Sequence, residues 1–373
     1  MNSTIASSLV SNAAPYISKY WSISSHYLLV LPTSMFLVGY VVGPIAWGPM
    51  SESYGRRPIM LSAFLLFTLS MLASALSPNF AALVVFRLLT GIAAACPIAV
   101  VGGTCADLFA QPEPRGRAMA FFMAATTWGP CGGPVISGFI SVIDWRWSLW
   151  VGLIFAGVTW VPLLFVPETY GPMVLKRRAQ RLRKQGRGDV VAPIELEKAD
   201  LAHIVSVVLT RPIRMMCFEP LVLFTCLYLS YAYAIFYLFL VAYTFIYVDI
   251  YGFSTGEEGL TFLAIGVGAM FACFVYFGWD AVLRRAYEKD TWWSRREEFR
   301  RLPLACLAGP FFVISCFWVG WTSRKDVHWI VPALSGIPFG IGYLLLFMAL
   351  LNYLVDAVRT FLHNLCDLYV LTS

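Results

Sequence analysis

The sequence predicts an all-α integral membrane protein with about nine transmembrane helices. Of the 373 residues, 59% are hydrophobic and 13% are charged, and the mean hydropathy is +0.71. A soluble domain carries about a quarter charged residues. The apolar runs are continuous rather than alternating, and a backbone in lipid must satisfy its own hydrogen bonds. Both observations favour helices over the strands of a barrel.

Nine apolar segments reach the length that crosses a hydrocarbon core, about 20 residues. They are residues 30–47, 59–76, 81–104, 118–140, 147–166, 219–246, 258–279, 303–322 and 329–354. A polar stretch, 167–217, separates the first five from the last four. Its opening sequence, PETYGPMVLKRRAQRLRK, predicts an amphipathic helix on the inner leaflet, and a second helix is predicted after Pro193.

The basic residues indicate how the chain crosses the membrane. If the loop at 48–58 faces the cytoplasm, 22 of the 27 lysines and arginines lie on that side, which the positive-inside rule favours. The segment 171–216 is then cytoplasmic and residues 248–257 are external. The net charge of +6 follows from this topology. We therefore expect a lipid bilayer, and no nucleic acid, among the partners.

The start of the chain does not explain this orientation. A cytoplasmic first loop places the N-terminus outside, yet the first residues lack the basic region of a signal peptide. Two explanations stay open: a weak span within residues 3–18, or the lack of a segment that normally precedes this one.

The sequence shows no pattern of enzymatic chemistry. The nine cysteines are odd in number and form no C-x-x-C pair, the four histidines have no metal-ligand spacing, and no nucleophile elbow occurs. We expect buried thiols, no catalytic residue, no metal and no cofactor, and hence a protein that is not an enzyme.

The loop GPMSESYGRRPIML, residues 48–61, resembles the signature loop between the second and third helices of the major facilitator superfamily. Gly48, Gly55, Arg56 and Arg57 stand at the matching positions, and Glu52 replaces the usual Asp. The resemblance implies a latch on the cytoplasmic side, in which Glu52 and the two arginines form charge-assisted bonds that differ between conformations. The alternative is that the arginines are ordinary positive-inside anchors.

Two further motifs follow in the family's order. Arg87 and Gly91, in RLLTGIAAA, resemble the fourth-helix motif, which implies a role in proton coupling; Arg87 could instead snorkel to water or pin a neighbouring helix. The sequence WGPCGGPVISGF is similar to the antiporter motif of the fifth helix. It has Gly129, Pro130 and Gly133, with Pro134 in place of a glycine, and implies a hinge and an anti-leak seal, or simple close packing.

The sequences DWRW, PETYGPMVLKRRAQRLRK and RPIRMMCFEP resemble fungal drug:proton antiporters of the twelve-helix branch, multidrug and polyamine exporters. Such proteins have two six-helix halves. The first span here matches the family's second helix, so we expect an incomplete bundle that lacks most of helix one and helices eleven and twelve. The expected divisions are an external N-terminal segment, the N-terminal half, a cytoplasmic loop, a partial C-terminal half and a divergent tail, at residues 1–28, 29–166, 167–217, 218–357 and 358–373.

Substrate recognition is hard to predict from the residues. Tyr233 and Tyr237 lie four apart on one helical face, where an aromatic cavity wall would suit amphipathic cations. Core packing and interfacial belts are the alternative roles for these rings.

The resemblance implies a secondary transporter that exports drugs, toxins or polyamine-like molecules in exchange for protons. Its partners would be a small-molecule substrate and protons, and its place the plasma membrane or the vacuolar membrane. Two alternatives remain: a non-transporting relic or partner-binding membrane protein, and a sugar or nutrient symporter, which the antiporter-like GPCGG disfavours.

Overall fold

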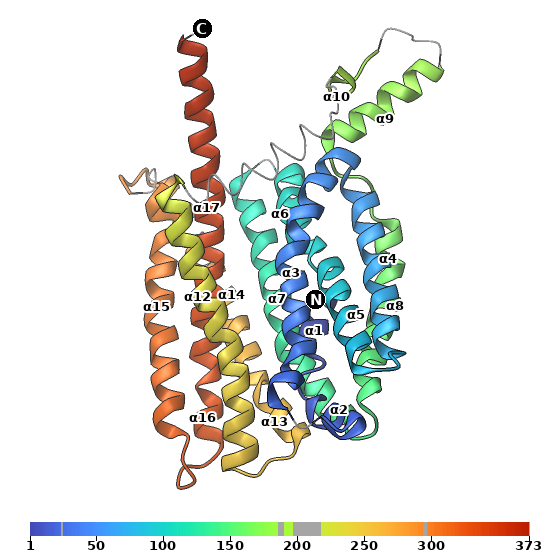
Figure 1. Cartoon of the computed structure of the whole chain (residues 1–373). Coiled ribbons are helices and arrows are strands. Elements are labelled where there is room, and N and C mark those ends of the chain that lie inside the picture. Colours follow the sequence, from blue (N-terminus) through green and yellow to red (C-terminus); the bar gives the residue numbers. More distant parts are fainter. Residues whose placement is uncertain (24, 110, 186–189, 197–217, 294–296, 373) are drawn as a thin grey trace. The chain divides into compact units, whose positions relative to one another are not determined.

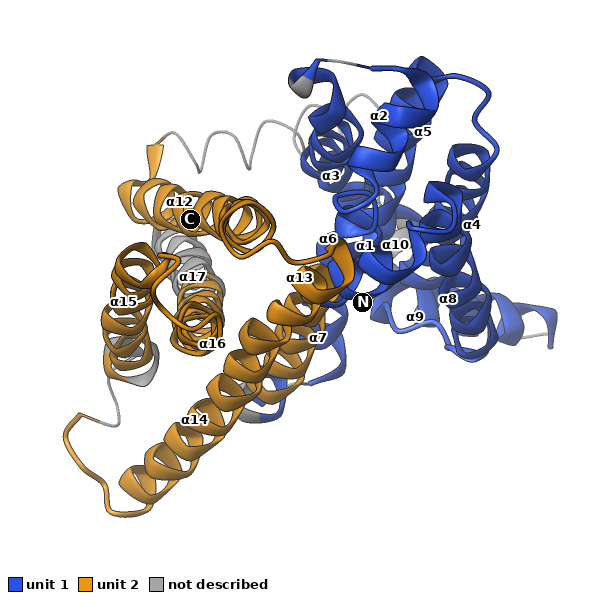
Figure 2. Ribbon diagram, turned by 90° about the horizontal axis from the view of Figure 1, so that it is seen from below, with its two compact units in different colours: residues 1–115, 132–213 blue, residues 116–131, 214–373 orange. Residues whose placement is uncertain are grey.

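Figure 1 shows the protein as a computed structural model, which describes residues 1–372 except 24, 110, 186–189, 197–217 and 294–296. Every regular element in these described residues is a helix, which confirms the predicted all-α class. The chain separates into two compact units, residues 1–115 with 132–213 and residues 116–131 with 214–373 (Figure 2). Helix α7 (Pro112–Ile140) gives its middle part to the second unit and both ends to the first.

The first unit is a bundle in which α3 packs along α5, and α4 packs against α5 and α8. Its core is formed largely by Ala, Leu, Ile and Phe side chains of these helices and of the first residues of the chain. Besides the ends of α7, its elements are α1 (Asn2–Ser8), α2 (Ala14–Trp21), α3 (His26–Tyr54), α4 (Arg56–Ala75), α5 (Phe80–Ala94), α6 (Cys96–Leu108), α8 (Trp145–Phe165), α9 (Gly171–Lys184) and α10 (Pro193–Leu196).

The second unit is organised around α17, which packs against α15, α14 and α12. Its core contains one cluster rich in Ala and Leu and a second rich in Phe and Tyr. Besides the middle of α7, its elements are α12 (Pro220–Thr244), the π-helix η1 (Phe245–Ile250), α13 (Thr255–Thr261), α14 (Leu263–Glu288), α15 (Glu297–Thr322), α16 (Ile330–Leu334) and α17 (Gly336–Thr372).

Eight helical segments of the described residues are long and apolar enough to cross a membrane, and they match eight of the nine predicted spans. The ninth prediction, 118–140, lies in α7, a 29-residue helix that does not reach the same hydropathy. Gly, Pro and Thr residues interrupt its apolar sequence, which explains the difference. The expected integral membrane character is confirmed by the length and composition of the other eight.

The first residues of the chain pack into the core of the first unit. Leu9 is fully buried and belongs to the same core cluster as Phe36 and Met71. The amide of Asn2 donates a hydrogen bond of 2.7 Å to the hydroxyl of Thr159 on α8. The segment forms two short helices, α1 and α2, rather than one continuous span.

A glycine on each of two helices sets the closest approach in the first unit. A methyl group on Gly91 of α5 would collide with the carbonyl of Phe36 on α3, and one on Gly39 of α3 would collide with the carbonyl of Leu88 on α5. Each glycine lies three residues after the carbonyl that the other helix touches. Small residues let the two backbones meet in this reciprocal way.

The second unit repeats this contact with the same spacing. A methyl group on Gly268 of α14 would collide with the carbonyl of Ile337 on α17, and one on Gly340 of α17 would collide with that of Ile265 on α14. Again each glycine follows, by three residues, the carbonyl that faces its partner. The two units thus share one type of helix crossing, with glycines at the same spacing.

The polar central segment is partly described. The predicted amphipathic helix is confirmed as α9, whose described residues include exposed Val174 and Leu175 beside a run of basic side chains. The second predicted helix begins as α10, and its sequence from 197 onward lies outside the described residues. Arg183 of α9 and Glu195 of α10 form an ion pair, with nitrogen and oxygen 2.6 Å apart.

Candidate functional site

The segment 48–58, predicted as a loop, is helical except at one sharp joint between two helices. Helix α3 includes Gly48 and ends at Tyr54, and α4 starts at Arg56. The joint is Gly55, with a φ of +98°, in the region that only glycine enters without strain. A methyl group on Gly55 would also press against the carboxylate of Glu168, 2.6 Å from one oxygen. A glycine is thus required at this joint for two physical reasons, its backbone conformation and the closeness of Glu168.

Arg56 is buried, with 6% of its surface exposed. Its Nε lies 3.3 Å from the Asp107 carboxylate of α6, and its Nη1 donates to the hydroxyl of Ser51 at 2.7 Å. The guanidinium also stacks over the ring of Tyr170, 5.2 Å from its centre. A methyl group on Gly103, one turn before Asp107, would collide with the Arg56 guanidinium. The arginine therefore fastens α4 to α6 and to the segment after α8.

Glu168 binds the beginning of α4 with its side chain almost fully buried, 3% exposed. Its carboxylate accepts the backbone N–H of Arg56 at 2.9 Å and that of Arg57 at 3.3 Å. It also accepts the N–H groups of Thr169 and Tyr170, both at 3.1 Å. The first N–H groups of a helix have no partner within the helix and carry partial positive charge, so a carboxylate is a favourable cap.

The structure gives Arg56 and Arg57 partners other than Glu52. Glu52 is exposed on α3. Arg57 donates from its Nη2 to the carbonyl of Leu164 at 2.9 Å, at the end of α8. The predicted bonds to Glu52 therefore stay a prediction, whereas Glu168 and Asp107 hold the acidic positions beside the two arginines in this structure.

Glu168 and Asp107 were missed in the sequence because they lie far along the chain from the loop. One signal did exist: Glu168 is the sole acid between Asp144 and Asp189, and it follows an apolar span directly. An isolated acid at the end of a span, ahead of a strongly basic helix, could have been paired with the arginines of the loop.

Arg87 is fully buried on α5, with 0% of its surface exposed. Its Nη2 donates to the carbonyl of Ala6 at 2.8 Å and to that of Ser7 at 3.4 Å, and its Nε donates to the carbonyl of Pro32 at 3.2 Å. The guanidinium lies over the ring of Phe36, 4.7 Å from its centre.

These contacts follow from the way helices end. Ala6 and Ser7 belong to the last turn of α1, where carbonyls lack partners within the helix and carry partial negative charge. The Arg87 cation supplies donors to them and so joins α1 and α3 to α5. The helix-pinning alternative for Arg87 matches this geometry, and the side chain does not snorkel to water here. Gly91, one turn further on, forms the α3 crossing described above.

The four residues of the antiporter-like motif are all buried within α7. The unit boundary at 131–132 places Gly129 and Pro130 in the second unit and Gly133 and Pro134 in the first. A methyl group on Gly133 would collide with the side chain of Ser8, so this glycine lets α1 approach α7.

Tyr233 and Tyr237 lie side by side on α12, as their spacing predicts. Their ring centres are 5.2 Å apart. Both rings are half-buried against the cluster rich in Phe and Tyr in the second unit, and Tyr233 also contacts Phe347 of α17 at 6.3 Å. Aromatic packing thus accounts for both rings, and contact with a substrate stays a prediction.

The second unit has an ion cluster that the sequence analysis did not find. Arg117 of α7 donates to the carboxylate of Asp280 on α14 from Nε at 2.9 Å and from Nη2 at 2.8 Å. Arg284 lies one turn beyond Asp280, with its Nη2 at 3.8 Å from the same carboxylate. One carboxylate of this unit thus pairs with two arginine side chains.

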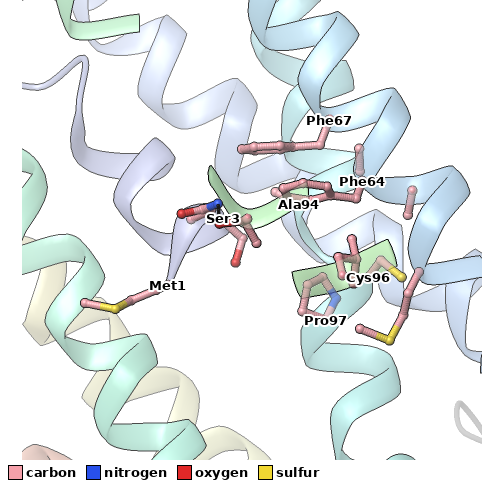
Figure 3. A pocket seen from close by; sticks show the side chains of 13 residues that line it. Met1, Ser3, Phe64, Phe67, Ala94, Cys96 and Pro97 are labelled. Atoms are coloured by element: carbon pink, nitrogen blue, oxygen red, sulfur yellow. Dashed lines mark hydrogen bonds between the residues drawn. The ribbon is translucent and has the colours of Figure 1, made fainter. Parts of the chain in front are cut away.

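A cavity of about 210 Å³ lies within the first unit, and Figure 3 shows it lined by Met1, Ser3, Phe64, Phe67 and Cys96. Its walls come from α1, α4, α5, α6 and α8 and are mainly apolar. None of the residues predicted to act in the latch, in proton coupling or in substrate contact lines it.

Comparison with known proteins places the chain in a family. The efflux pump FUBT of Fusarium oxysporum is 33% identical over 96% of this chain and 60% of its own length. Polyamine transporter 3 of Saccharomyces cerevisiae is 33% identical over 88% of this chain and 52% of its own length. The chain therefore spans about half to three-fifths of these curated relatives.

The fold has a solved counterpart. The xylose transporter XylE of E. coli, in a partially occluded inward-open conformation, matches with a TM-score of 0.61 at 16% identity, over 96% of this chain and 84% of that one. This likeness concerns the fold alone. Residues 1–363 match the family model described as Major Facilitator Superfamily. The chain belongs to the major facilitator superfamily.

Proposed function

We propose that this protein is a proton-coupled exporter of drugs, toxins or polyamine-like organic molecules. The observation that carries the proposal is the buried cluster around Arg56 and Glu168, at the loop whose sequence resembles the signature loop of the major facilitator superfamily. The efflux pump and the polyamine transporter among its relatives support the same class of function.

The cluster is suited to act as a conformational latch. Arg56, Glu168 and Asp107 join the start of α4 to α6 and to the end of α8. Charge-assisted bonds of this kind shift an equilibrium when they exist in one conformation and are broken in another. The Asp280 cluster of the second unit has the same chemistry and is proposed for the same task. Gly48, Gly55, Arg57 and Glu52 complete the proposed latch.

Arg87 and Gly91 are proposed to serve proton coupling by fixing the end of α1. The guanidinium holds the last carbonyls of α1, so a change in its hydration or charge environment would move that helix. The motif at Gly129, Pro130, Gly133 and Pro134 is proposed as the hinge of α7, since two prolines remove backbone donors there. Tyr233 and Tyr237 are proposed to contact the substrate.

A transport assay tests the proposal. The purified protein, reconstituted in liposomes under an imposed proton gradient, is expected to take up a lipophilic cation in a saturable way. Uptake should disappear with a proton ionophore. A folded, monodisperse preparation that transports no member of a panel of drugs and polyamines would contradict the proposal and favour the non-transporting, partner-binding alternative. Uptake of a sugar together with protons would favour the symporter alternative.

The orientation gives a separate prediction. Gln185→Cys, at the end of α9, is expected to resist a membrane-impermeant thiol reagent in intact cells and to react after permeabilisation. Gly252→Cys, between η1 and α13, is expected to react in intact cells. The parent protein with its native cysteines gives the background. The opposite pattern would overturn the topology that we propose.

The cell membrane that houses the protein is also a proposal. Export of toxic molecules is useful at the plasma membrane, and storage of such molecules is useful at the vacuolar membrane. Fluorescence microscopy of a tagged protein beside markers of both membranes distinguishes the two.

A further inference from the structure

Glu258 is the most deeply buried acid of the described residues, with 1% of its surface exposed. It lies in α13, inside the candidate span Thr255–Glu288. A charged carboxylate at such a place is costly unless it is paired or hydrated. The proposed roles of the latch and of Arg87 do not explain why a carboxyl group is buried at this position.

Glu258 forms a hydrogen bond with the side chain of Thr244, and this bond depends on whether the carboxyl group is protonated. The Thr244 hydroxyl oxygen of α12 lies 2.5 Å from a carboxyl oxygen of Glu258 and 3.4 Å from the carbonyl of Leu240. A hydroxyl has one proton to donate. If Thr244 donates to Leu240, Glu258 must be protonated and donate to Thr244. If Glu258 is ionised, Thr244 must turn its proton toward the carboxylate.

Among the described residues, the elements that pack most closely against α13 offer no nearby cation. These elements are α12, η1 and α14. Helix α12 has no charged residue, η1 has Asp249, and the arginines of α14 begin at Arg284. Arg284 is 21 residues beyond the start of α14, about 30 Å along the helix.

Three further titratable groups of these elements, Tyr243, Tyr247 and Glu257, have other partners. The hydroxyl of Tyr243 contacts the carbonyl of Pro332, and the hydroxyl of Tyr247 contacts the carbonyl of Trp329. Glu257, on α13 itself, is exposed and caps that helix through Ser254. Burial without a cation favours a neutral carboxyl group, and the Thr244 hydroxyl gives the ionised form one stabilising bond.

We propose that Glu258 is a proton-binding site, which takes up and releases one proton by exchanging the two hydrogen-bond arrangements with Thr244. On uptake an O–H bond forms on the carboxylate and the Thr244 proton turns to Leu240; release reverses both steps. The assignment of Glu258 as the proton carrier of export rests on the proposed function. Proton binding itself can be measured without transport.

Infrared difference spectroscopy of the purified protein in lipid, between acid and alkaline buffer, tests the site. The parent protein is expected to show the carbonyl stretch of a protonated carboxyl group that titrates with pH. Glu258→Gln should lose this band. Glu257→Gln, which removes the same charge from the adjacent exposed position, should keep it. Thr244→Val should shift the frequency of the band, and Thr244→Ser should restore it.

Several results would overturn the site. These are a parent spectrum without a titrating carboxyl band, a band that persists in folded Glu258→Gln, and a Thr244→Val spectrum identical to that of the parent. If Glu258→Gln does not fold, the two Thr244 variants still decide the question. In the liposome assay, Glu258→Gln should lose gradient-driven uptake and Glu257→Gln should retain it. A protein that shows the band but no transport would support the proton-binding site and contradict only the exporter proposal.

Discussion

Arg87→Met is expected to destabilise the protein by about 3 kcal/mol, because three buried backbone carbonyls lose their donor. An acceptor left unsatisfied in the interior costs about 1–3 kcal/mol of stability. Removing the arginine also removes the cost of burying its charge, which offsets part of this loss. Methionine keeps most of the side-chain volume, so a cavity contributes little. Thermal unfolding of the purified protein in detergent, followed by tryptophan fluorescence, measures the change.

The matched control is Arg178→Met, which removes one arginine from an exposed position of α9. It is expected to change stability by less than about 0.5 kcal/mol, as is usual for a surface substitution. Arg87→Lys should fall between the two, because an ammonium keeps the charge but cannot span the carbonyls of two helices as a guanidinium does. Equal stability of Arg87→Met and Arg178→Met would show that Arg87 does not hold α1 in place.

The same variant should also lose gradient-driven uptake, by roughly tenfold or more if the coupling energy is the usual 1–3 kcal/mol. Measurement at a temperature well below the unfolding transition separates this effect from lost stability. A stable Arg87→Met protein with normal uptake would restrict the arginine to a structural role.

The helices could be predicted from the sequence because membrane spans are determined locally. Continuous apolar runs fix the positions of the spans, and eight of nine predicted segments met the criteria of length and hydropathy. The joint at Gly55 could also be predicted, since a glycine ahead of two arginines marks a turn between helices.

The partners of the arginines could not be predicted in the same way. Arg56 meets Glu168, 112 residues along the chain, and Arg87 meets Ala6, 81 residues away. Such pairs depend on how the helices pack, and a sequence without structural information gives several acids as candidates. Glu52 was the natural choice because it is close in sequence, but its position on α3 leaves the side chain exposed.

Glu258 illustrates the opposite difficulty. In the sequence it stands beside Glu257 at the edge of a predicted span, where two solvated acids would be ordinary. Only the helix geometry distinguishes them, since one side chain caps α13 at the surface and the other turns inward to Thr244. The period of the helix places adjacent residues on different faces.

Glu168→Gln is expected to lower stability by about 3 kcal/mol and to change the conformational equilibrium more than any other substitution in the latch. The carboxylate receives four backbone N–H groups, and hydrogen bonds to a charged group are each worth about 1.5–3 kcal/mol. Glutamine keeps one oxygen acceptor and the shape, so part of the bonding survives. The loss of charge removes the favourable interaction with the beginning of α4.

Glu52→Gln is the matched control, because it removes the same charge from a position close to the same helix joint. Its exposed position predicts a change in stability below about 0.5 kcal/mol. Hydrogen–deuterium exchange of the α3–α4 joint should rise in Glu168→Gln and stay unchanged in Glu52→Gln, and uptake should fall several-fold in the first variant alone. A latch that shifts an equilibrium acts on turnover and leaves the affinity of a distant substrate site unchanged. Substrate binding should therefore be equal in both variants.

A larger effect from Glu52→Gln would assign the latch to the pair that the sequence predicted, formed in a conformation other than this one. A larger effect from Glu168→Gln would place the acid of the latch at the end of α8, where its carboxylate contacts both arginines through their backbone.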